Sequence, residues 1–411
     1  MNEKKILFIC QYFYPETFRG NDIAFHWAEK GHYVHVVTGI PNYPEGKFFP
    51  GYGIFKKRKE TIRGVKVTHL PIVPRGKDSK IMLMLNYFSY LFVGWIWMFF
   101  HALFHRYDMV FCQQLSPVTM SSPAVLYKKV RHVPLYTWVL DLWPESLAVA
   151  GGIRNKYILG FFDLFVKSEY KNSDKILTSS KSFDQSILKY GAFKDKVIYC
   201  PQWSDGVSNG KSPNFILPKK LVDLSDGNNF IVMFAGAVGE AHGMECNMRA
   251  ALKTKSHNNI KWVIVGDGRR LDWVRSFVKT NGLEDTVITL GRFPSETMPV
   301  FFEKADVMLV SLTDSPLFNM YSPAKIASYM AASRPIIAVL NGEGGEVIKA
   351  ASCGWNVQAG DADELASLVI KLSQANKTLL EEKGIHGRQY YDKFFKKDKC
   401  MLRLDEIVFK D

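Results

Sequence analysis

The run MLVSLTDSPLFNMYSPAKIASYMAASRPIIAVLNGEGGEV, residues 308–347, decides the fold of this chain. An apolar strand at residues 307–310 leads through a polar loop to a short helix, and a second apolar strand at residues 335–340 opens into a glycine-rich turn. We expect Ser322 to be the N-cap of the helix and Pro323 its first residue, where a missing N–H costs nothing. The order strand, helix, strand predicts a parallel α/β sheet. Glycine turns at the carboxyl ends of such strands expose backbone N–H groups that bind phosphorylated ligands, although an ordinary βαβ turn has the same pattern.

Strand-to-glycine turns recur through the second half of the chain. Four strands are expected to end at Gly236, Gly266, Gly291 and Gly342, the first three in the runs FIVMFAG (residues 230–236), WVIVGDGRR (262–270) and VITLGRFP (287–294). A single GDG is a weak signal, but four such turns in register predict a nucleotide site.

The first half of the chain has its own strand pattern. Apolar strands are expected at residues 5–10, 33–38, 108–112, 133–140, 175–180 and 196–200. A polar stretch after PQWSDG (residues 201–206) is the best domain boundary. At 411 residues and 47% hydrophobic content, the chain is long enough for two such domains.

The run SPAKIASYMAASRPIIAVLNGEGGEV resembles the donor-binding signature of retaining glycosyltransferase family 4. The run GHYVHVVT (residues 31–38) and the loop DLWPES (141–146) are similar to its bacterial branch that adds N-acetylated amino sugars to O-antigen or capsule, the L-fucosamine transferase-like members. The resemblance covers the whole chain. It implies a GT-B fold, in which two Rossmann-like doubly wound α/β domains face a cleft. Residues 1–205 are then a membrane-associating acceptor domain, 206–385 a nucleotide-sugar domain, and 386–411 a helix crossing back.

The resemblance also implies the donor-binding residues. The family usually carries two glutamates eight positions apart, and here Met320 and Ser328 stand at those positions. Lys325 could then supply charge to a diphosphate and Glu346 a hydroxyl contact, whereas Arg19 and His242 fit ordinary loop residues equally well. The full set of donor-binding candidates is Arg19, Gly20, Gly236, Gly239, His242, Gly266, Arg292, Phe293, Ser322, Ser328, Gly344, Gly345 and Glu346.

Catalytic candidates come from both halves. By resemblance, Asp141 and Glu145 hold the acceptor hydroxyl, Trp143 offers a flat face to a sugar, and Lys325 completes the set. Helix capping is the alternative for the two carboxylates. The resemblance implies retention of configuration, with the departing phosphate taking the acceptor proton. Because the acidic residues at 361 and 363 fit a helix N-terminus, we expect no metal and no cofactor beyond the UDP-sugar substrate.

Charge and hydropathy point to a membrane surface. The net charge is +13, and between Lys47 and Lys77 the basic residues face only Glu60. Residues 81–104 contain no Asp, Glu, Lys or Arg; as a helix they would span roughly 36 Å, enough to cross a bilayer. A single crossing would separate strands 5–10 and 108–112, which belong in one sheet. We therefore expect an interfacial helix, with a buried core helix as the alternative, and place at the headgroup boundary the aromatic residues Tyr87, Tyr90, Trp95 and Trp97.

These observations predict a cytoplasmic enzyme attached peripherally to the inner membrane, with its six scattered cysteines as buried thiols in a reducing compartment. It is expected to move an N-acetylated amino or deoxyamino sugar from a UDP-sugar to a polyprenyl-diphosphate-linked oligosaccharide. The alternatives are a UDP-N-acetylhexosamine 2-epimerase-like enzyme and a catalytically inactive assembly partner. A nucleic-acid partner would explain the charge but not the glycine turns, so none is expected.

Overall fold

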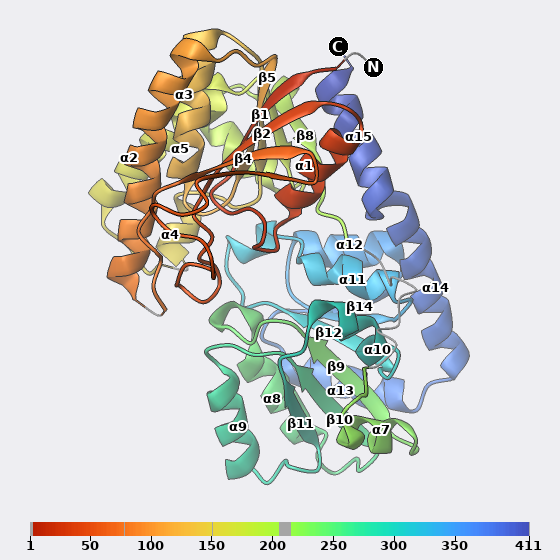
Figure 1. Ribbon diagram of the computed structural model, residues 1–411. Helices are drawn as coiled ribbons and strands as arrows, with labels where there is room; N and C mark the ends of the chain where they lie inside the picture. The colour runs from red at the N-terminus through yellow and green to blue at the C-terminus, as the bar shows by residue number, and fades with distance from the viewer. Residues whose placement is uncertain (1–2, 78, 150, 205–214, 411) are drawn as a thin grey trace. The chain divides into compact units, whose positions relative to one another are not determined.

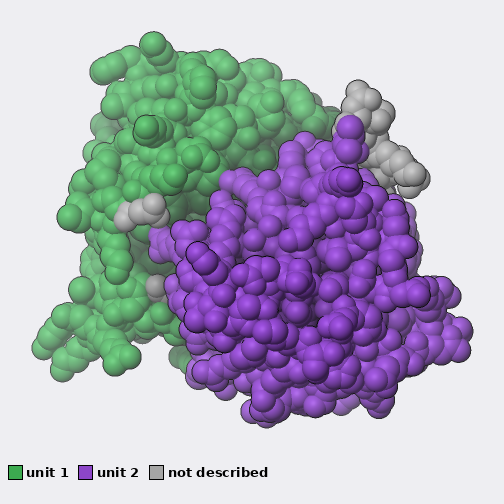
Figure 2. Space-filling view, turned by 90° about the horizontal axis from the view of Figure 1, so that it is seen from below, with its two compact units in different colours: residues 1–200, 403–411 green, residues 201–402 purple. Residues whose placement is uncertain are grey.

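The computed structural model describes residues 3–77, 79–149, 151–204 and 215–410, and the chain divides into two compact units. Unit 1 comprises Met1–Cys200 with Arg403–Asp411, and unit 2 comprises Pro201–Leu402 (Figure 2). Each unit is a mainly parallel sheet with helices on both faces, so the expected class of two Rossmann-like α/β domains is confirmed. The predicted boundary between residues 205 and 206 lies outside the described residues.

The sheet of unit 1 has eight strands. In spatial order they are β3 (Lys59–Ile62), β4 (Val65–Leu70), β2 (Tyr33–Gly39), β1 (Lys5–Ile9), β5 (Met109–Gln114), β6 (Leu135–Val139), β7 (Lys175–Thr178) and β8 (Val197–Tyr199). All neighbours are parallel except β3 and β4. The strand order reverses between β1 and β5, and ligands of doubly wound sheets bind beyond the carboxyl ends of the strands at such a point. The β3–β4 hairpin was not predicted, because β3, with the sequence KETI, lacks the apolar run of the other strands.

Helices cover both faces of this sheet. Figure 1 shows α2, α3 and α5 side by side on one face, and α1 and α15 on the other. The helices of unit 1 are α1 (Arg19–Glu29), α2 (Lys80–Phe104), α3 (Ser122–Arg131), α4 (Glu145–Val149), α5 (Lys156–Asn172) and α6 (Phe183–Ile187), with the end of α15 (Lys397–Phe409).

Helix α2 is the expected apolar helix, and it is mostly exposed. Only 28% of the most apolar 18-residue segment of this helix is buried, so the alternative of a buried core helix is wrong. Among the described residues it is the one helix long and apolar enough to cross a membrane. A single crossing is excluded because β4 before it and β5 after it belong to one sheet. Tyr90 is buried and donates to the Cys10 carbonyl at 3.1 Å, so its predicted place at the headgroup boundary is wrong, whereas Trp95 is 49% exposed.

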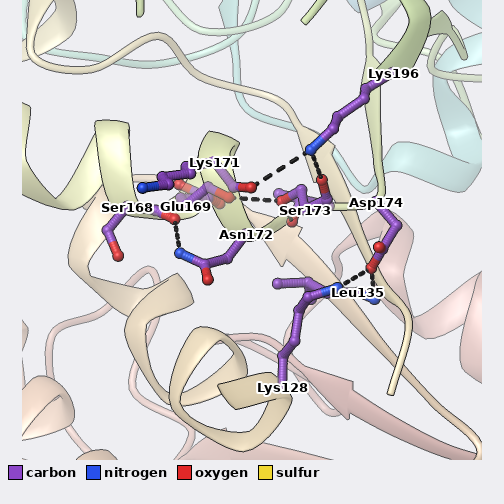
Figure 3. A network of polar contacts seen from close by, with 10 residues as sticks. Lys128, Leu135, Ser168, Glu169, Lys171, Asn172, Ser173, Asp174 and Lys196 are labelled. Carbon is purple, nitrogen blue, oxygen red and sulfur yellow. Dashed lines mark hydrogen bonds and ion pairs between the residues drawn. The ribbon is translucent and has the colours of Figure 1, made fainter. Parts of the chain in front are cut away.

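The amino ends of β6 and β7 are tied to the end of α5 (Figure 3). Asp174 accepts hydrogen bonds from the Leu135 N–H at 2.7 Å and from the Lys128 ammonium. Lys196 donates to the Ser173 carbonyl at 2.9 Å. This network lies at the amino ends of the strands, away from the carboxyl ends where ligands bind. We therefore assign it a role in stability.

The sheet of unit 2 is wholly parallel. Its strands in spatial order are β11 (Val287–Gly291), β10 (Ile260–Val265), β9 (Phe230–Ala235), β12 (Val307–Ser311), β13 (Ile336–Val339) and β14 (Gly354–Val357). This is the doubly wound order with its reversal between β9 and β12. Along β9, Val232 and Phe234 enter one core while Ile231 and Met233 enter the other, because successive side chains point to opposite faces.

Two layers of helices bury these faces. Helices α8 (Met244–Lys253), α9 (Leu271–Thr280) and α13 (Ala362–Ser373) enclose the first core. The second lies under α7 (Lys219–Ser225), α10 (Met298–Phe302), α11 (Ala324–Ala331), α12 (Glu343–Ala351) and α14 (Lys377–Phe394). Asp361 caps α13 by accepting from the Glu364 N–H at 2.8 Å, which confirms the helix N-terminus predicted there.

The end of the chain is two helices, where one closing helix was expected. Tyr391 on α14 donates to the Ser204 carbonyl at 3.0 Å within unit 2. Helix α15 enters unit 1 at Arg403, and its buried Asp405 accepts from the Trp27 Nε1–H at 2.9 Å and the Lys30 ammonium at 2.6 Å. The six cysteines are free and buried, as expected.

Candidate functional site

The glycine turns of unit 2 pack against one another at the carboxyl ends of β9, β10 and β11. The Gly236 N–H donates to the Val265 carbonyl at 2.9 Å, and the Gly266 N–H donates to the Gly291 carbonyl at 2.7 Å. A Cβ at Gly266 would lie 1.8 Å from the Gly236 carbonyl oxygen, and the φ of Gly266 is +149°. Only glycine fits there, so these predicted donor residues form one layered backbone surface next to the switch point.

The loop after β9 is fastened to the end of β12. It forms a short 3-10 turn, Glu240–His242, in which the His242 Nδ1 accepts from the Gly239 N–H at 3.3 Å. Ser311, the last residue of β12, donates to the His242 carbonyl at 2.7 Å. Burial, and secondarily the nearby Lys325, lower the pKa of His242 to about 4. The ring is therefore neutral near pH 7 with its proton on Nε2, so it could meet a phosphate as a hydrogen-bond donor and not as a cation.

Helix α11 places Lys325 against the same turns. Tyr329 fixes the helix to β9, because its hydroxyl donates to the Ala235 carbonyl at 2.8 Å and accepts from the Ala235 N–H at 3.1 Å. Lys325 lies four residues earlier on the same helical face. Its Nζ lies 3.9 Å from the centroid of the Phe234 ring and 3.2 Å from the position that a Cβ on Gly236 would take.

The Lys325 ammonium is the most unusual group of this site. Its Nζ is buried and has no hydrogen-bond partner among the described residues. Burial lowers its pKa from 10.5 to about 7. Keeping a buried amine without an opposite charge is costly, and an anion bound beside it would offset that cost. A neutral histidine and this amine together suit a diphosphate.

Two expectations about the loops flanking α11 are wrong. Pro323 is the N-cap of α11, not its first residue, because its ψ of 129° is extended; Ser322 therefore precedes the cap. Gly344 and Gly345 lie in the first turn of α12, not in a loop, and a Cβ at Gly345 would meet the Asn356 Oδ1 at 2.8 Å. Their small size is thus required for packing.

The remaining donor candidates are dispersed over unit 2. Glu346 is exposed and lines a groove of about 680 Å³ between α12, β14 and α13. The Ser328 hydroxyl lies 3.1 Å from the Ser204 hydroxyl. Arg292 is exposed, and the Phe293 ring packs on Phe301 with 4.7 Å between centroids. Their roles in donor binding stay predictions.

In unit 1, Asp141 follows β6 and is held firmly in place. It accepts hydrogen bonds from the hydroxyls of Ser116 and Ser146 and, at 3.1 Å, from the Trp143 Nε1–H. Trp143 is buried and packs on Phe162, so the prediction that it offers a face to a sugar is wrong.

The second predicted carboxylate of unit 1, Glu145, begins α4. Its Oε1 accepts from the Ser186 hydroxyl at 2.5 Å, while its Oε2 is buried with no hydrogen-bond partner in the described part of the chain. The catalytic role of both carboxylates stays a prediction.

Sequence analysis missed a polar set at the switch point of unit 1. Gln11 follows β1, and Gln113 and Gln114 end β5; the Oε1 atoms of all three are buried without a hydrogen-bond partner among the described residues. Arg19 and Gly20 were expected in the loop before the first helix. They lie instead in the first turn of α1. A Cβ at Gly20 would lie 2.1 Å from the Gln113 Oε1, so glycine makes room for this amide. The sequence feature that could have indicated this set is the presence of glutamines at the ends of otherwise apolar strands.

Glu16 was also missed. Its buried carboxylate accepts from the backbone N–H groups of Phe13 (3.2 Å), Asn42 (2.8 Å) and Tyr43 (2.6 Å). Burial raises its pKa to about 7 against the opposing effect of these hydrogen bonds. Glu16 thereby joins the loops after β1 and β2, which no spacing in the sequence indicates.

No group of three or more His, Cys, Asp or Glu side chains among the described residues is placed to hold a metal ion.

Comparison with known proteins identifies the domain that contains the glycine turns and Lys325. Residues 229–375 match the family described as glycosyl transferases group 1. This segment is thus similar to a glycosyltransferase group 1 domain. It includes β9 through α13 and therefore the whole layered surface described above.

Relatives of the group 1 domain extend beyond that segment. The probable glycosyltransferase WbjE of Pseudomonas aeruginosa is 24% identical over 266 residues, which cover 62% of this chain and 65% of that protein. The putative colanic acid biosynthesis glycosyl transferase WcaI of Escherichia coli K12 is 22% identical over 295 residues, 69% of each chain. The match to WbjE thus spans a little under two thirds of its length.

Solved structures give the fold of the whole chain. Anabaena Alr3699/HepE in complex with UDP and glucose aligns over 100% of both chains with a TM-score of 0.69 and 13% identity. At that identity the likeness shows the fold alone, and the fold is GT-B.

Proposed function

We propose that this protein is a retaining, metal-independent glycosyltransferase of bacterial surface polysaccharide synthesis. It moves an N-acetylated amino or deoxyamino sugar from a UDP-sugar to a polyprenyl-diphosphate-linked glycan. The observation that carries the proposal is the buried Lys325 Nζ without a partner among the described residues, against the glycine turns of a group 1 domain. The UDP and glucose bound by the structurally similar HepE support the choice of donor.

In this proposal unit 2 stabilises the leaving group. As the glycosidic bond to the diphosphate breaks, negative charge grows on the phosphate oxygens. The Lys325 ammonium lies against the Phe234 ring and Gly236 and is fixed in position before the reaction, so it stabilises this charge without reorganising. The acceptor oxygen bonds to the anomeric carbon while its proton passes to the departing diphosphate, and the transferred sugar retains its configuration.

Unit 1 holds the acceptor hydroxyl in this account. Asp141 begins the loop after β6 and Glu145 follows that loop at the start of α4, and we assign to these two carboxylates the orientation of the hydroxyl. The buried amides of Gln11 and Gln113 at the adjacent switch point add further polar contacts for a sugar. None of these groups need form a covalent adduct.

The lipid-linked acceptor requires work at a membrane surface. Helix α2 exposes large apolar side chains along its length, with Ile81 73% exposed, Phe92 63% and Phe104 79%. The loop and hairpin before it carry the basic stretch from Lys47 to Lys77. An apolar helix with a basic segment supplies the two-part anchoring of a peripheral protein, which we place on the cytoplasmic face of the inner membrane.

A donor panel tests the proposal. Thermal shifts should rise with UDP and with one UDP-linked amino sugar, and stay unchanged with GDP- and dTDP-sugars. Lys325→Met should reduce the UDP shift. Conversion of the UDP-sugar without any acceptor would favour an epimerase, and a protein that binds no nucleotide sugar would fit an inactive assembly partner.

A further inference from the structure

A groove of about 560 Å³ in unit 1 lies between α2 and the edge of the sheet formed by β2, β4 and β3. It is separate from the polar set at the switch point. Gln11 and Gln113 mark the carboxyl ends of β1 and β5, whereas His35 and Lys66 of the groove lie near the amino ends of β2 and β4. Neither glutamine lines the groove, which extends along β4 from Lys66 to Pro71, toward the sheet edge formed by β3.

One wall of the groove is apolar and comes from α2. It is lined by Val93, Ile96, Trp97, Phe100 and Phe104. Ile96, Phe100 and Phe104 are 62%, 58% and 79% exposed, so this wall continues into the outer face of the helix that we propose meets the membrane. The Trp97 ring is stacked on His101 with 4.2 Å between centroids, which fixes the middle of the wall.

The opposite wall is cationic. Lys59 on β3 and Lys66 on β4 lie on the same face of the hairpin, because Lys59 pairs with Thr68 two residues along from Lys66. Neither ammonium makes an ion pair or hydrogen bond that fixes it to another described residue. Arg58 joins them at the rim, its Nε donating to the His69 carbonyl at 2.5 Å. No Asp or Glu is among the residues that line the groove.

The floor is neutral. The His35 Nε2 lies 2.8 Å from the Thr68 hydroxyl and its Nδ1 2.5 Å from the Tyr107 hydroxyl, which is also 3.0 Å from the His101 Nε2. Burial, and then neighbouring positive charge, lower the pKa of His35 to about 3 and that of His101 to about 4. The charge of the groove therefore lies at its mouth, on the lysines and Arg58.

We propose that this groove binds one anionic phospholipid drawn from the bilayer, with its phosphate between Lys59 and Lys66 and the start of an acyl chain along α2. The inference rests on the membrane association proposed above and names a lipid chemistry for it. An apolar wall with a cationic rim and no carboxylate complements a molecule with an anionic head and an apolar tail. A free phosphate would contact only the cationic residues of the groove. The tail of a neutral lipid would contact only the apolar wall.

The test uses the full-length protein and short-chain lipids below their micelle concentration, so that binding does not depend on a bilayer. Dihexanoyl phosphatidylglycerol, dihexanoyl phosphatidylcholine and inorganic phosphate are titrated by calorimetry at physiological salt. We expect saturable one-to-one binding of phosphatidylglycerol, at least about tenfold tighter than phosphatidylcholine, and no detectable binding of phosphate.

Two double variants with the same charge change separate the groove from general attraction. Lys59→Gln with Lys66→Gln should weaken phosphatidylglycerol binding about tenfold or more, while Lys47→Gln with Lys56→Gln, which do not line the groove, should stay within about twofold. Equal losses in both variants, equal affinity for the two lipids, or binding of phosphate alone would overturn the proposal. Absence of phosphatidylglycerol binding in a protein that still binds anionic vesicles would overturn the groove proposal and leave the membrane association standing.

Discussion

Replacing Lys325 with methionine should make the protein more stable and a poorer binder of UDP. Methionine keeps the length and apolar stem of lysine but removes the amine that lies buried against the Phe234 ring. In the folded protein the pKa of Lys325 is lowered from 10.5 to about 7. A lowered lysine pKa means that the folded state binds this proton less well than the unfolded state, so the residue destabilises the fold below pH 10.5.

The size of the effect follows from that shift. One pKa unit corresponds to about 1.4 kcal/mol, so near pH 7 the buried amine costs as much as ~4 kcal/mol of the free energy of unfolding. The variant should therefore melt several degrees higher at pH 7, and the difference should shrink as the pH rises toward 10.5 and the unfolded chain also loses the proton.

UDP binding should change in the opposite direction. Loss of a charged hydrogen bond to the diphosphate should weaken binding by about 1–3 kcal/mol. In the wild type, a bound diphosphate favours the charged amine, so UDP affinity should fall as the pH rises above 7, by at most about tenfold per unit.

Calorimetric titration with UDP and thermal melts from pH 7 to pH 10 measure both effects. Lys304→Met is a matched control: its ammonium is partly exposed and 4.0 Å from Asp226, and it lies outside the glycine turns. Unchanged UDP affinity in Lys325→Met, or a variant less stable than the wild type at pH 7, would refute the reasoning.

Four further predictions concern the packing, the membrane face and the chemistry. Gly266→Ala should destabilise unit 2 by about 3 kcal/mol or more, since its Cβ would meet a carbonyl at 1.8 Å, whereas Gly31→Ala, with nothing within 4 Å, should cost only about 1 kcal/mol in denaturant melts; equal costs would contradict the contact. Asp405→Asn should cost about 1–3 kcal/mol at pH 7, against about 0.5 kcal/mol or less for the exposed Glu406→Gln. Burial opposes ionisation of Asp405, but its hydrogen bonds bring its pKa below 3.8, so this difference should persist at pH 5 and fade only below pH 3.8. Trp95→Glu should release the protein from anionic vesicles without lowering its melting temperature; unfolding instead would mean that this face of α2 is core. Transfer activity should persist in EDTA, and a loss that only Mg²⁺ or Mn²⁺ restores would contradict a metal-independent reaction.

Most strands of unit 2 could be predicted because they depend on local patterns. Apolar runs that end in glycine predicted β9, β10, β11 and β13, and the helix between β12 and β13 was marked by Pro323. The same local reasoning placed that helix start one residue early, since the extended ψ of Pro323 depends on how its loop packs. It also overlooked the β3–β4 hairpin, whose first strand, KETI, is mostly polar and charged.

The candidate site was predicted only in part, because burial there arises from contacts distant in the sequence. Lys325 was identified as a phosphate ligand, but its burial depends on Tyr329 fixing α11 to β9. Trp143 has the composition of a sugar-binding residue and is instead covered by Phe162. Glu16 and Gln113 could not be found, since only the fold places them beside Asn42 and Gly20.

The most direct test of the account is sugar transfer to a lipid acceptor. Purified protein is incubated with the UDP-sugar that gives the largest thermal shift and with a polyprenyl-diphosphate-linked glycan in anionic vesicles, and both the released UDP and the extracted lipid are measured. We predict equal amounts of UDP and of lipid lengthened by one sugar, with the anomeric configuration of the donor kept. UDP-sugar that stays intact, or that is converted while the lipid stays unchanged, would contradict the account.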